Sequence, residues 1–214
     1  PRRSSAIDLA AMTRIVRAVE ESGLDAVCTS DHPFPVVGRG EPAHHCHDPF
    51  VLLTHAAAHT TRIRLVFSLL VVPYRNPFLT ASMLATLDYT SGGRVVAGLG
   101  AGYARPEFAA LGADHQRRAA QIDTAARAMR LAWTGEPVEF DGTGWSARGN
   151  SLRPVPASPA AIGLWRGGNG PTAVEHAARD LDGWMPFEAP DSMAAAASTT
   201  SITMRTIGGE ARRF

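Results

Sequence analysis

Residues 64–72, Arg-Leu-Val-Phe-Ser-Leu-Leu-Val-Val, form an almost unbroken run of aliphatic and β-branched side chains. Such a run is typical of a parallel strand that is covered on both faces. The next apolar run, residues 94–100, comes after a segment, residues 76–93, that begins with Asn-Pro and ends with Gly-Gly. These are the marks of a helix start and a helix end, so the region is predicted to be a strand, a helix and a second strand.

The same alternation continues on both sides of this unit. We expect further helices over residues 7–22, 48–60, 116–133 and 171–179, and further strands over residues 25–30, 161–165 and 183–187. Residues 135–159 are rich in Gly, Pro and Ser and predict an excursion with a short hairpin, whereas residues 188–214 are weakly patterned, with room for one helix. The pattern predicts an α/β protein with a parallel sheet, which fits both an open doubly wound sheet and a closed barrel.

Composition limits the classes of protein to which the chain can belong. Its 214 residues are 45% hydrophobic and 19% charged, which is typical of a single globular domain over residues 1–214. A formal net charge of +1 gives no electrostatic reason to expect nucleic acid as a partner. The longest apolar run, residues 65–73, is about half of the roughly 20 residues that a membrane span needs. We expect a cytoplasmic protein without a membrane partner and, because the chain opens at Pro1, further natural sequence before it.

Polar or glycine-rich turns lie at the carboxyl ends of four predicted strands, at residues 30–33, 68–76, 98–103 and 167–170. Ligands bind at this edge in both a barrel and an open sheet. In the first turn, Asp31 and His32 pair a carboxylate with a side chain that exchanges protons near neutral pH. The pair is a catalytic candidate, and the alternative is a structural pair that satisfies loop amides.

Two of these turns are rich in glycine. Residues 167–171, Gly-Gly-Asn-Gly-Pro, stand at a helix start, where free amides suit a phosphate, and a plain strand-to-helix turn is the equal alternative. Residues 98–102 contain Gly-x-Gly-x-Gly, whose third glycine comes one residue too early for the dinucleotide-binding fingerprint. This turn suits instead a close approach beneath a flat ring.

Cysteine and histidine indicate neither a disulfide framework nor a metal centre. Cys28 lies in an apolar strand pattern and is predicted to be buried. Residues 44–48, His-His-Cys-His-Asp, carry metal-ligating side chains, but adjacent residues rarely reach one ion and no second spaced cluster follows. A histidine-rich loop is favoured there over a zinc or nickel site, so no metal is predicted.

Taken together, the turns resemble those of the luciferase-like monooxygenase superfamily, and most of all its deazaflavin branch, the oxidoreductases that use coenzyme F420. The matching motifs run in the expected order over residues 25–187. They are Ser-Asp-His at 30–32, Pro-Tyr-Arg-Asn-Pro at 73–77, Thr-Leu-Asp at 86–88, Ser-Gly-Gly-Arg at 91–94, Gly-Leu-Gly-Ala-Gly-Tyr at 98–103, Trp-Thr-Gly-Glu-Pro-Val at 133–138, Leu-Arg-Pro at 152–154, Gly-Gly-Asn at 167–169 and Asp-Gly-Trp-Met-Pro at 182–186.

The resemblance implies a fold that periodicity leaves open. It implies a (β/α)8 TIM barrel whose first strand would precede Pro1 and whose last would follow Phe214. Residues 1–214 would then be one luciferase-like barrel domain that is incomplete at both ends. The family also implies a homodimer.

The resemblance further implies where the coenzyme and a small-molecule substrate would bind. The ring would lie over a bulge in the third strand of the barrel, with a non-proline cis peptide that falls by position between Ser68 and Leu69, and the phosphate near Gly167. The candidate catalytic residues are His32 and Asp31. The candidate cofactor-binding residues are Ser68, Leu69, Gly100, Ala101, Gly102, Tyr103, Gly167, Gly168 and Asn169.

Three departures from the family pattern bear on function. Tyr103 occupies a position that is an acid in a sugar-phosphate branch, so the phenol speaks against that substrate. Arg166 replaces an aliphatic residue, where it would either hold the anionic tail of the coenzyme or clash with the barrel interior. His47 replaces an aromatic residue.

The leading hypothesis is hydride transfer between reduced deazaflavin and a small organic substrate. One alternative is an FMN-dependent monooxygenase that uses oxygen and a partner flavin reductase. A third, favoured by the missing end strands, is a truncated barrel that binds a ligand without catalysis.

Overall fold

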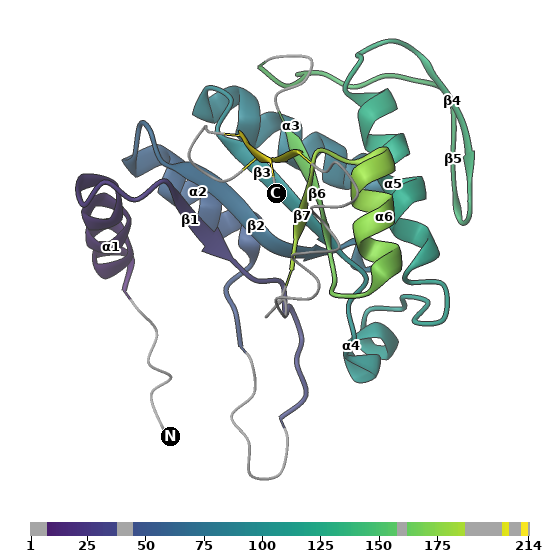
Figure 1. Cartoon of the computed structure of the whole chain (residues 1–214), viewed down its shortest axis with the longest axis horizontal. Coiled ribbons are helices and arrows are strands. Elements are labelled where there is room, and N and C mark those ends of the chain that lie inside the picture. The colour runs from purple at the N-terminus through teal and green to yellow at the C-terminus, as the bar shows by residue number, and fades with distance from the viewer. Residues whose placement is uncertain (1–7, 38–44, 158–161, 187–202, 206–210, 214) are drawn as a thin grey trace.

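The computed structural model describes residues 8–37, 45–157, 162–186, 203–205 and 211–213. Its main sheet has five parallel strands that lie side by side in chain order (Figure 1). They are β1 (Ala26–Thr29), β2 (Arg64–Val71), β3 (Val95–Gly100), β6 (Gly163–Gly167) and β7 (Gly183–Met185). The five predicted strands are confirmed, although β6 begins two residues later than expected and Phe187 lies outside the described residues.

The predicted helices are also confirmed. They are α1 (Leu9–Glu21), α2 (Pro49–His59), α3 (Pro77–Ser91), α5 (Ala120–Ala132) and α6 (Pro171–Asp180). The short helices η1 (Val72–Tyr74) and α4 (Arg105–Ala110) were not predicted. The expected hairpin is formed by β4 (Val138–Gly142) and β5 (Trp145–Asn150), which pair antiparallel apart from the main sheet. None of the helices in the described part is long and apolar enough to cross a membrane.

The expectation of a helix within residues 188–214 is not met where the structure can test it. The described residues there form two short antiparallel strands, β8 (Thr203–Arg205) and β9 (Ala211–Arg213). The remaining residues of this segment lie outside the described ranges.

The strand order separates the two architectures that the alternation left open. A doubly wound sheet reverses its strand order at a switch point, whereas the order β1-β2-β3-β6-β7 runs in one direction only. Right-handed crossovers of one direction place the connecting helices on one face of the sheet. The described strands therefore form a singly wound, open parallel sheet, and no closed barrel is present among them.

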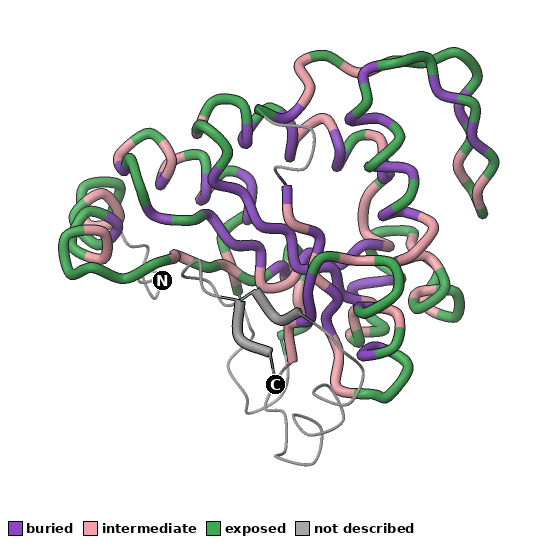
Figure 2. Tube along the Cα trace, turned by 45° about the horizontal axis from the view of Figure 1, so that its top comes forward, coloured by how far each residue is buried: buried purple, intermediate pink, exposed green. Residues whose placement is uncertain are grey.

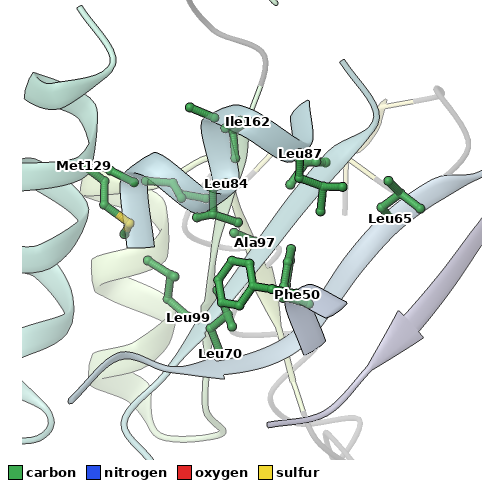
Figure 3. Close-up of a cluster of buried hydrophobic side chains, with 14 of the residues drawn as sticks. Phe50, Leu65, Leu70, Leu84, Leu87, Ala97, Leu99, Met129 and Ile162 are labelled. Carbon is green, nitrogen blue, oxygen red and sulfur yellow. The ribbon is translucent and has the colours of Figure 1, made fainter. Parts of the chain in front are cut away.

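The hydrophobic core lies between this sheet and its helices (Figure 2). Alternate strand residues, such as Leu65 and Phe67 of β2 and Ala97 and Leu99 of β3, pack against side chains of α2, α3 and α5 (Figure 3). A register shift between Phe67 and Leu70 moves this alternation by one residue, so that Leu70 continues the core face. The bulge thereby turns Leu69 to the face of the sheet opposite the helices, which we call the inner face.

The prediction that Cys28 is buried is wrong, because its side chain is exposed. β1 is an edge strand of the described sheet, and none of its four residues is buried. An apolar strand pattern does not reveal which strand of a sheet lies at its edge.

Two of the motif residues are structural. The buried Asp88 accepts from the backbone N–H groups of Val95 (3.4 Å) and Ala157 (3.0 Å), and burial raises the pKa of its carboxyl. The guanidinium of Arg94 donates to backbone carbonyls, including that of Ile63 (3.0 Å), and ties the start of β3 to the end of α2.

Candidate functional site

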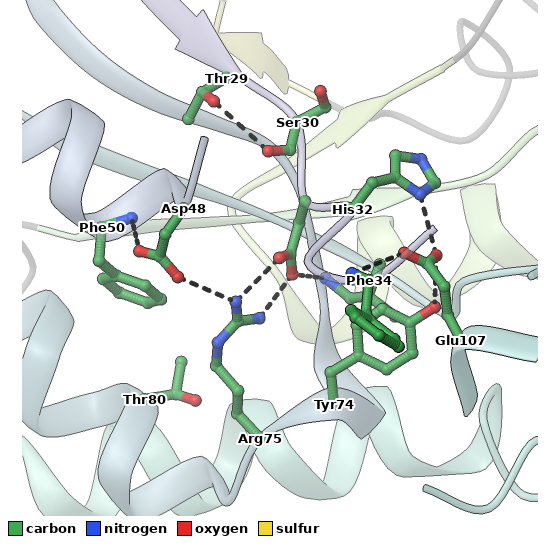
Figure 4. A network of polar contacts seen from close by, with 12 residues as sticks. Thr29, Ser30, His32, Phe34, Asp48, Phe50, Tyr74, Arg75, Thr80 and Glu107 are labelled. Carbon is green, nitrogen blue, oxygen red and sulfur yellow. Dashed lines mark hydrogen bonds and ion pairs between the residues drawn. The ribbon is translucent and has the colours of Figure 1, made fainter. Parts of the chain in front are cut away.

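Asp31, one of the two predicted catalytic residues, is buried just beyond the carboxyl end of β1 and pairs with Arg75. Figure 4 shows the network of polar contacts around Arg75. Its Oδ2 accepts from Nη1 of Arg75 at 2.6 Å and from the backbone N–H of Val71 at 2.9 Å, and its Oδ1 accepts from Nη2 of Arg75 at 2.9 Å. Burial acts to lower the pKa of Arg75, but Asp31, with help from Asp48, raises it overall. Asp31 therefore joins the ends of β1 and β2.

His32 faces a different set of groups. Its Nδ1 lies 3.0 Å from Oε2 of Glu107, and its Nε2 lies 3.5 Å from the hydroxyl of Tyr103. The His32 and Tyr103 rings meet edge to face, with centroids 5.6 Å apart. The His32 side chain is 19% exposed and Tyr103 is 68% exposed, so this corner of the site is open to solvent. The turns after β1 and β3 are thus brought together, as their positions at one sheet edge predicted.

Glu107 was missed by the sequence analysis. It lies in α4, one helical turn beyond Tyr103, and its side chain is only 1% exposed. Its Oε2 accepts from the Tyr74 hydroxyl at 3.2 Å and its Oε1 from the backbone N–H of Phe34 at 3.3 Å (Figure 4). Burial first, and then the charge of Glu107, raise the pKa of Tyr74. The one signal in the sequence that could have indicated Glu107 was its position, about one helical turn after the glycine-rich turn at residues 98–103.

The bulge in β2 contains the predicted cis peptide bond between Ser68 and Leu69. The Leu69 side chain lies over glycines of the neighbouring strands. A Cβ added at Gly98 or Gly100 would come within 2.6 Å or 3.0 Å of Leu69 Cδ atoms, and one added at Gly167 would also meet Leu69. These glycines are therefore needed to seat Leu69, which is a different reason from the close ligand approach that the sequence suggested for Gly100 and Gly167.

The second glycine-rich turn is held by its own contacts. Gly102 has a φ of +74°, and an added Cβ would lie 2.5 Å from Cγ1 of Val71, while the half-buried Ala101 packs against the core. The turn therefore accepts only glycine at position 102, on steric grounds alone.

The turn after β6 differs from the other strand ends. The carbonyl of Gly168, a residue with φ +120°, accepts from the indole N–H of Trp184 at 2.7 Å, and the half-buried Asn169 follows it. Gly170 is the N-cap of helix α6 and provides no side-chain cap, whereas Asp48 and Asn76 cap α2 and α3. Uncapped amide groups with a positive helix end are what an anion requires.

Arg166 fits neither role that the sequence suggested. It lies on the helix face of β6, where its Nη1 is 2.5 Å from Oδ1 of Asp123 in α5. Asp123, His176 and Asp180 form the one group of three potential metal ligands in the described part of the chain whose ligand atoms all lie within 4.8 Å of one another. Asp123 already pairs with Arg166 and His176, and Asp180 with Arg179, so these carboxylates are balanced by protein groups.

The histidine-rich segment is described only in part. His44 lies outside the described residues, and Cys46 Sγ lies 3.1 Å from Oγ of Ser30 at the end of β1.

Comparison with known proteins places this site in a family. The sequence model of the luciferase-like monooxygenase family matches residues 1–203. The chain is 33% identical over 181 residues to an F420-dependent glucose-6-phosphate dehydrogenase of Gordonia bronchialis, an alignment that covers 81% of this chain and 52% of the relative. It is 35% identical over 173 residues to the enzyme of the same name from Nocardia farcinica, with 78% and 49% covered. The chain thus spans about half the length of these relatives.

Solved structures agree with the sequence relatives. The monooxygenase RslO1 from Streptomyces bottropensis superposes with a TM-score of 0.79 at 26% identity, covering 92% of this chain and 60% of that one. An F420-dependent secondary alcohol dehydrogenase, with a TM-score of 0.73 at 24% identity, shares the fold. The family match over residues 1–203 and these relatives show that the chain belongs to the luciferase-like monooxygenase family.

Proposed function

We propose that this protein is an oxidoreductase that transfers a hydride between coenzyme F420 and a small organic substrate. Its family and its F420-dependent relatives support this reading. The observation that carries it is the position of His32, whose ring lies between Glu107 and Tyr103 at the same sheet edge as the bulge at Ser68 and Leu69.

The residues of this edge fit a deazaflavin with an anionic tail. The uncapped start of α6 presents the positive end of the helix to a phosphate, next to Gly167, Gly168 and Asn169, and its first residue, Pro171, has no N–H to donate. Ser68, Leu69, Gly100, Ala101, Gly102 and Tyr103 would contact the ring from β2 and β3. When bound, the coenzyme supplies the hydride chemistry and the protein supplies orientation and proton handling.

Within this proposal the two predicted catalytic residues have different roles. His32 would hold or release the proton of the substrate at Nε2, the ring nitrogen that faces Tyr103. Asp31 is committed to Arg75 and would position the His32 turn without touching the substrate. The phenol of Tyr103, where the sugar-phosphate branch has an acid, favours an alcohol or carbonyl compound other than a sugar phosphate.

The architecture and the assembly are part of the same proposal. We infer that the singly wound sheet belongs to a (β/α)8 barrel and that residues 1–214 hold this barrel without its first strand and its last elements. A homodimer is expected on the family resemblance alone, and the cytoplasmic location remains the expectation of the sequence analysis.

An FMN-dependent monooxygenase is the second candidate. It is favoured by the high structural similarity to the monooxygenase RslO1, which has a TM-score of 0.79. The two candidates share the fold and differ in the ring that binds over the bulge.

Side-by-side fluorescence titrations of the purified protein with F420 and with FMN test the proposal. We expect F420 to bind and FMN to bind at least about tenfold more weakly, a difference of roughly 1.4 kcal/mol. A preference for FMN would move the assignment to the monooxygenase. Binding of neither by a folded sample would favour a barrel without catalysis.

A further inference from the structure

Glu107 is a buried acid whose surroundings restrict its chemistry. A carboxylate with 1% exposure is stable only where polar groups donate to it. Three groups surround this one: the backbone N–H of Phe34 at Oε1, and the Tyr74 hydroxyl and His32 Nδ1 at Oε2.

Two of these three groups have a defined direction. A backbone N–H only donates. The Tyr74 hydroxyl donates to Oε2 and keeps its proton, because burial and the nearby Glu107 raise its pKa. Both oxygens of Glu107 therefore act as acceptors in these two contacts. We assign the same role to Oε2 in the remaining contact, 3.0 Å long, so that His32 Nδ1 donates to it.

A neutral imidazole carries one hydrogen, so a hydrogen on Nδ1 leaves Nε2 as an acceptor. The Tyr103 hydroxyl, 3.5 Å from Nε2, shows that a hydroxyl group reaches this nitrogen from the open corner. We propose that Glu107 is a positioning residue that holds His32 in the tautomer with its hydrogen on Nδ1 and its Nε2 lone pair facing the substrate. This inference rests on the proposed function and deepens it.

The tautomer decides which reaction step His32 can perform. In alcohol oxidation Nε2 would take the proton from the substrate hydroxyl oxygen, and in carbonyl reduction it would return a proton to that oxygen. A bound deazaflavin would supply the acceptor or donor of the hydride at the carbon that bears this oxygen. The opposite tautomer would direct an N–H at the hydroxyl and could not take its proton. The same arrangement favours substrates that carry a hydroxyl or a carbonyl group at the reacting carbon.

Nitrogen NMR of the full chain, labelled at histidine, reads the tautomer directly. Protonated and unprotonated ring nitrogens have well-separated chemical shifts, and His32 is assigned from its absence in the His32→Asn variant. We expect the neutral His32 of the wild type to be protonated on Nδ1. A hydrogen on Nε2 would overturn the proposal, whatever the behaviour of any variant.

The variant Glu107→Gln tests the cause. Its amide oxygen can still accept from Phe34 N–H, while its NH2 group donates to both Nδ1 of His32 and the Tyr74 oxygen. We therefore expect the hydrogen of His32 to move to Nε2 and turnover to fall about tenfold or more, with KM and F420 affinity within about threefold. A folded variant with the wild-type tautomer would remove Glu107 as the cause.

Tyr103→Phe is the matched control, because it removes the hydroxyl at Nε2 and leaves Glu107 in place. We expect His32 to have the wild-type tautomer in Tyr103→Phe. If the tautomer changed in Tyr103→Phe and not in Glu107→Gln, the control of His32 would be assigned to Tyr103. The spectra require no coenzyme. Failure of F420 binding would thus end the proposed function and leave the tautomer result readable.

Discussion

The turns after β1 and after β6 lie at the same edge of one sheet and are built in opposite ways. After β1, charged and polar side chains form the structure, with Asp31 bound to Arg75 and His32 bound to Glu107. The turn after β6 depends instead on glycines, which have no side chain. Gly167 leaves room for Leu69, and Gly170 leaves α6 without a side-chain cap. The first turn suits proton chemistry and the second suits an anion. The comparison shows that one site can depend on side-chain contacts in one half and on exposed backbone in the other.

Removing a charge from the first turn should have the largest effect. Asp31→Asn leaves the guanidinium of Arg75 with Asp48 at 3.6 Å as its remaining carboxylate, and we expect unfolding free energy to fall by about 3 kcal/mol in urea titrations. The matched control is Asp141→Asn, which breaks the exposed pair with Arg148. This variant should change the unfolding free energy by less than about 0.5 kcal/mol. Equal losses would mean that burial of the Asp31 pair contributes nothing.

His32→Ala should separate chemistry from binding. We expect turnover to fall about 100-fold or more, because a positioned acid–base group is lost, while F420 affinity changes less than about threefold. Steady-state kinetics and fluorescence titration measure the two effects. Equal losses in both would indicate that His32 is structural.

The inner-face glycines should respond differently to loss of Leu69. Gly98→Ala would place a Cβ 2.6 Å from the Phe67 carbonyl oxygen, whereas the three atoms nearest to a Cβ in Gly100→Ala all belong to Leu69, the closest at 3.0 Å. We expect Gly98→Ala to destabilise by about 2 kcal/mol and Gly100→Ala by less than about 1 kcal/mol. In double-mutant cycles Leu69→Ala should relieve the strain of Gly100→Ala and leave most of that of Gly98→Ala. The reverse result would disprove this packing account.

An acid in the second turn should weaken coenzyme binding without harm to the fold. Gly170 has open space for a side chain and stands at the N-cap of α6, so Gly170→Asp should stabilise the helix and raise the Kd for F420 roughly tenfold. Gly170→Ser adds a cap without charge and should weaken binding less. Gly168→Asp should also lose affinity, but the φ of +120° there adds backbone strain. Unchanged affinity in Gly170→Asp would remove the phosphate assignment.

The smallest effect should be a change of stability with pH at Tyr74. Tyr74→Phe loses a donor to Glu107 and should be less stable than the wild type by about 1 kcal/mol at neutral pH. Burial and Glu107 raise the pKa of Tyr74 above its ordinary 10.0, so the unfolded chain ionises first as the pH rises. The wild type then loses the stability that the Tyr74 hydrogen bond contributes. The difference in unfolding free energy between the wild type and Tyr74→Phe should therefore narrow above about pH 10 in urea titrations. The matched control is Tyr89→Phe, which removes an exposed phenol and should change the unfolding free energy by less than about 0.5 kcal/mol at neutral pH.

Local signals in the chain were sufficient for the elements and for part of the site. The caps at Asp48 and Asn76 and the apolar run of β2 all lie where they were expected. The family resemblance correctly located the bulge and the cis peptide at Ser68 and Leu69. These features depend on neighbouring residues, which is why a linear pattern can reveal them.

Partners far apart in the chain were not predicted. Asp31 and Arg75 are 44 residues apart, and His32 and Glu107 are 75 residues apart. A parallel sheet brings such residues to one edge, but the pairing depends on the path of each turn. The face on which Arg166 lies and the exposure of Cys28 likewise depend on strand register and sheet edge.

The sequence by itself determined the α/β class, the strand-end turns and His32 as the candidate for proton transfer. These follow from side-chain periodicity and from the chemistry of residues close in the chain. The tertiary structure alone decided the single winding direction of the sheet, the pairing of His32 with Glu107 and the use of three glycines to seat Leu69. The physical reason is that hydrogen bonds and steric contacts depend on distances in space, which strand pairing sets only once the chain has folded.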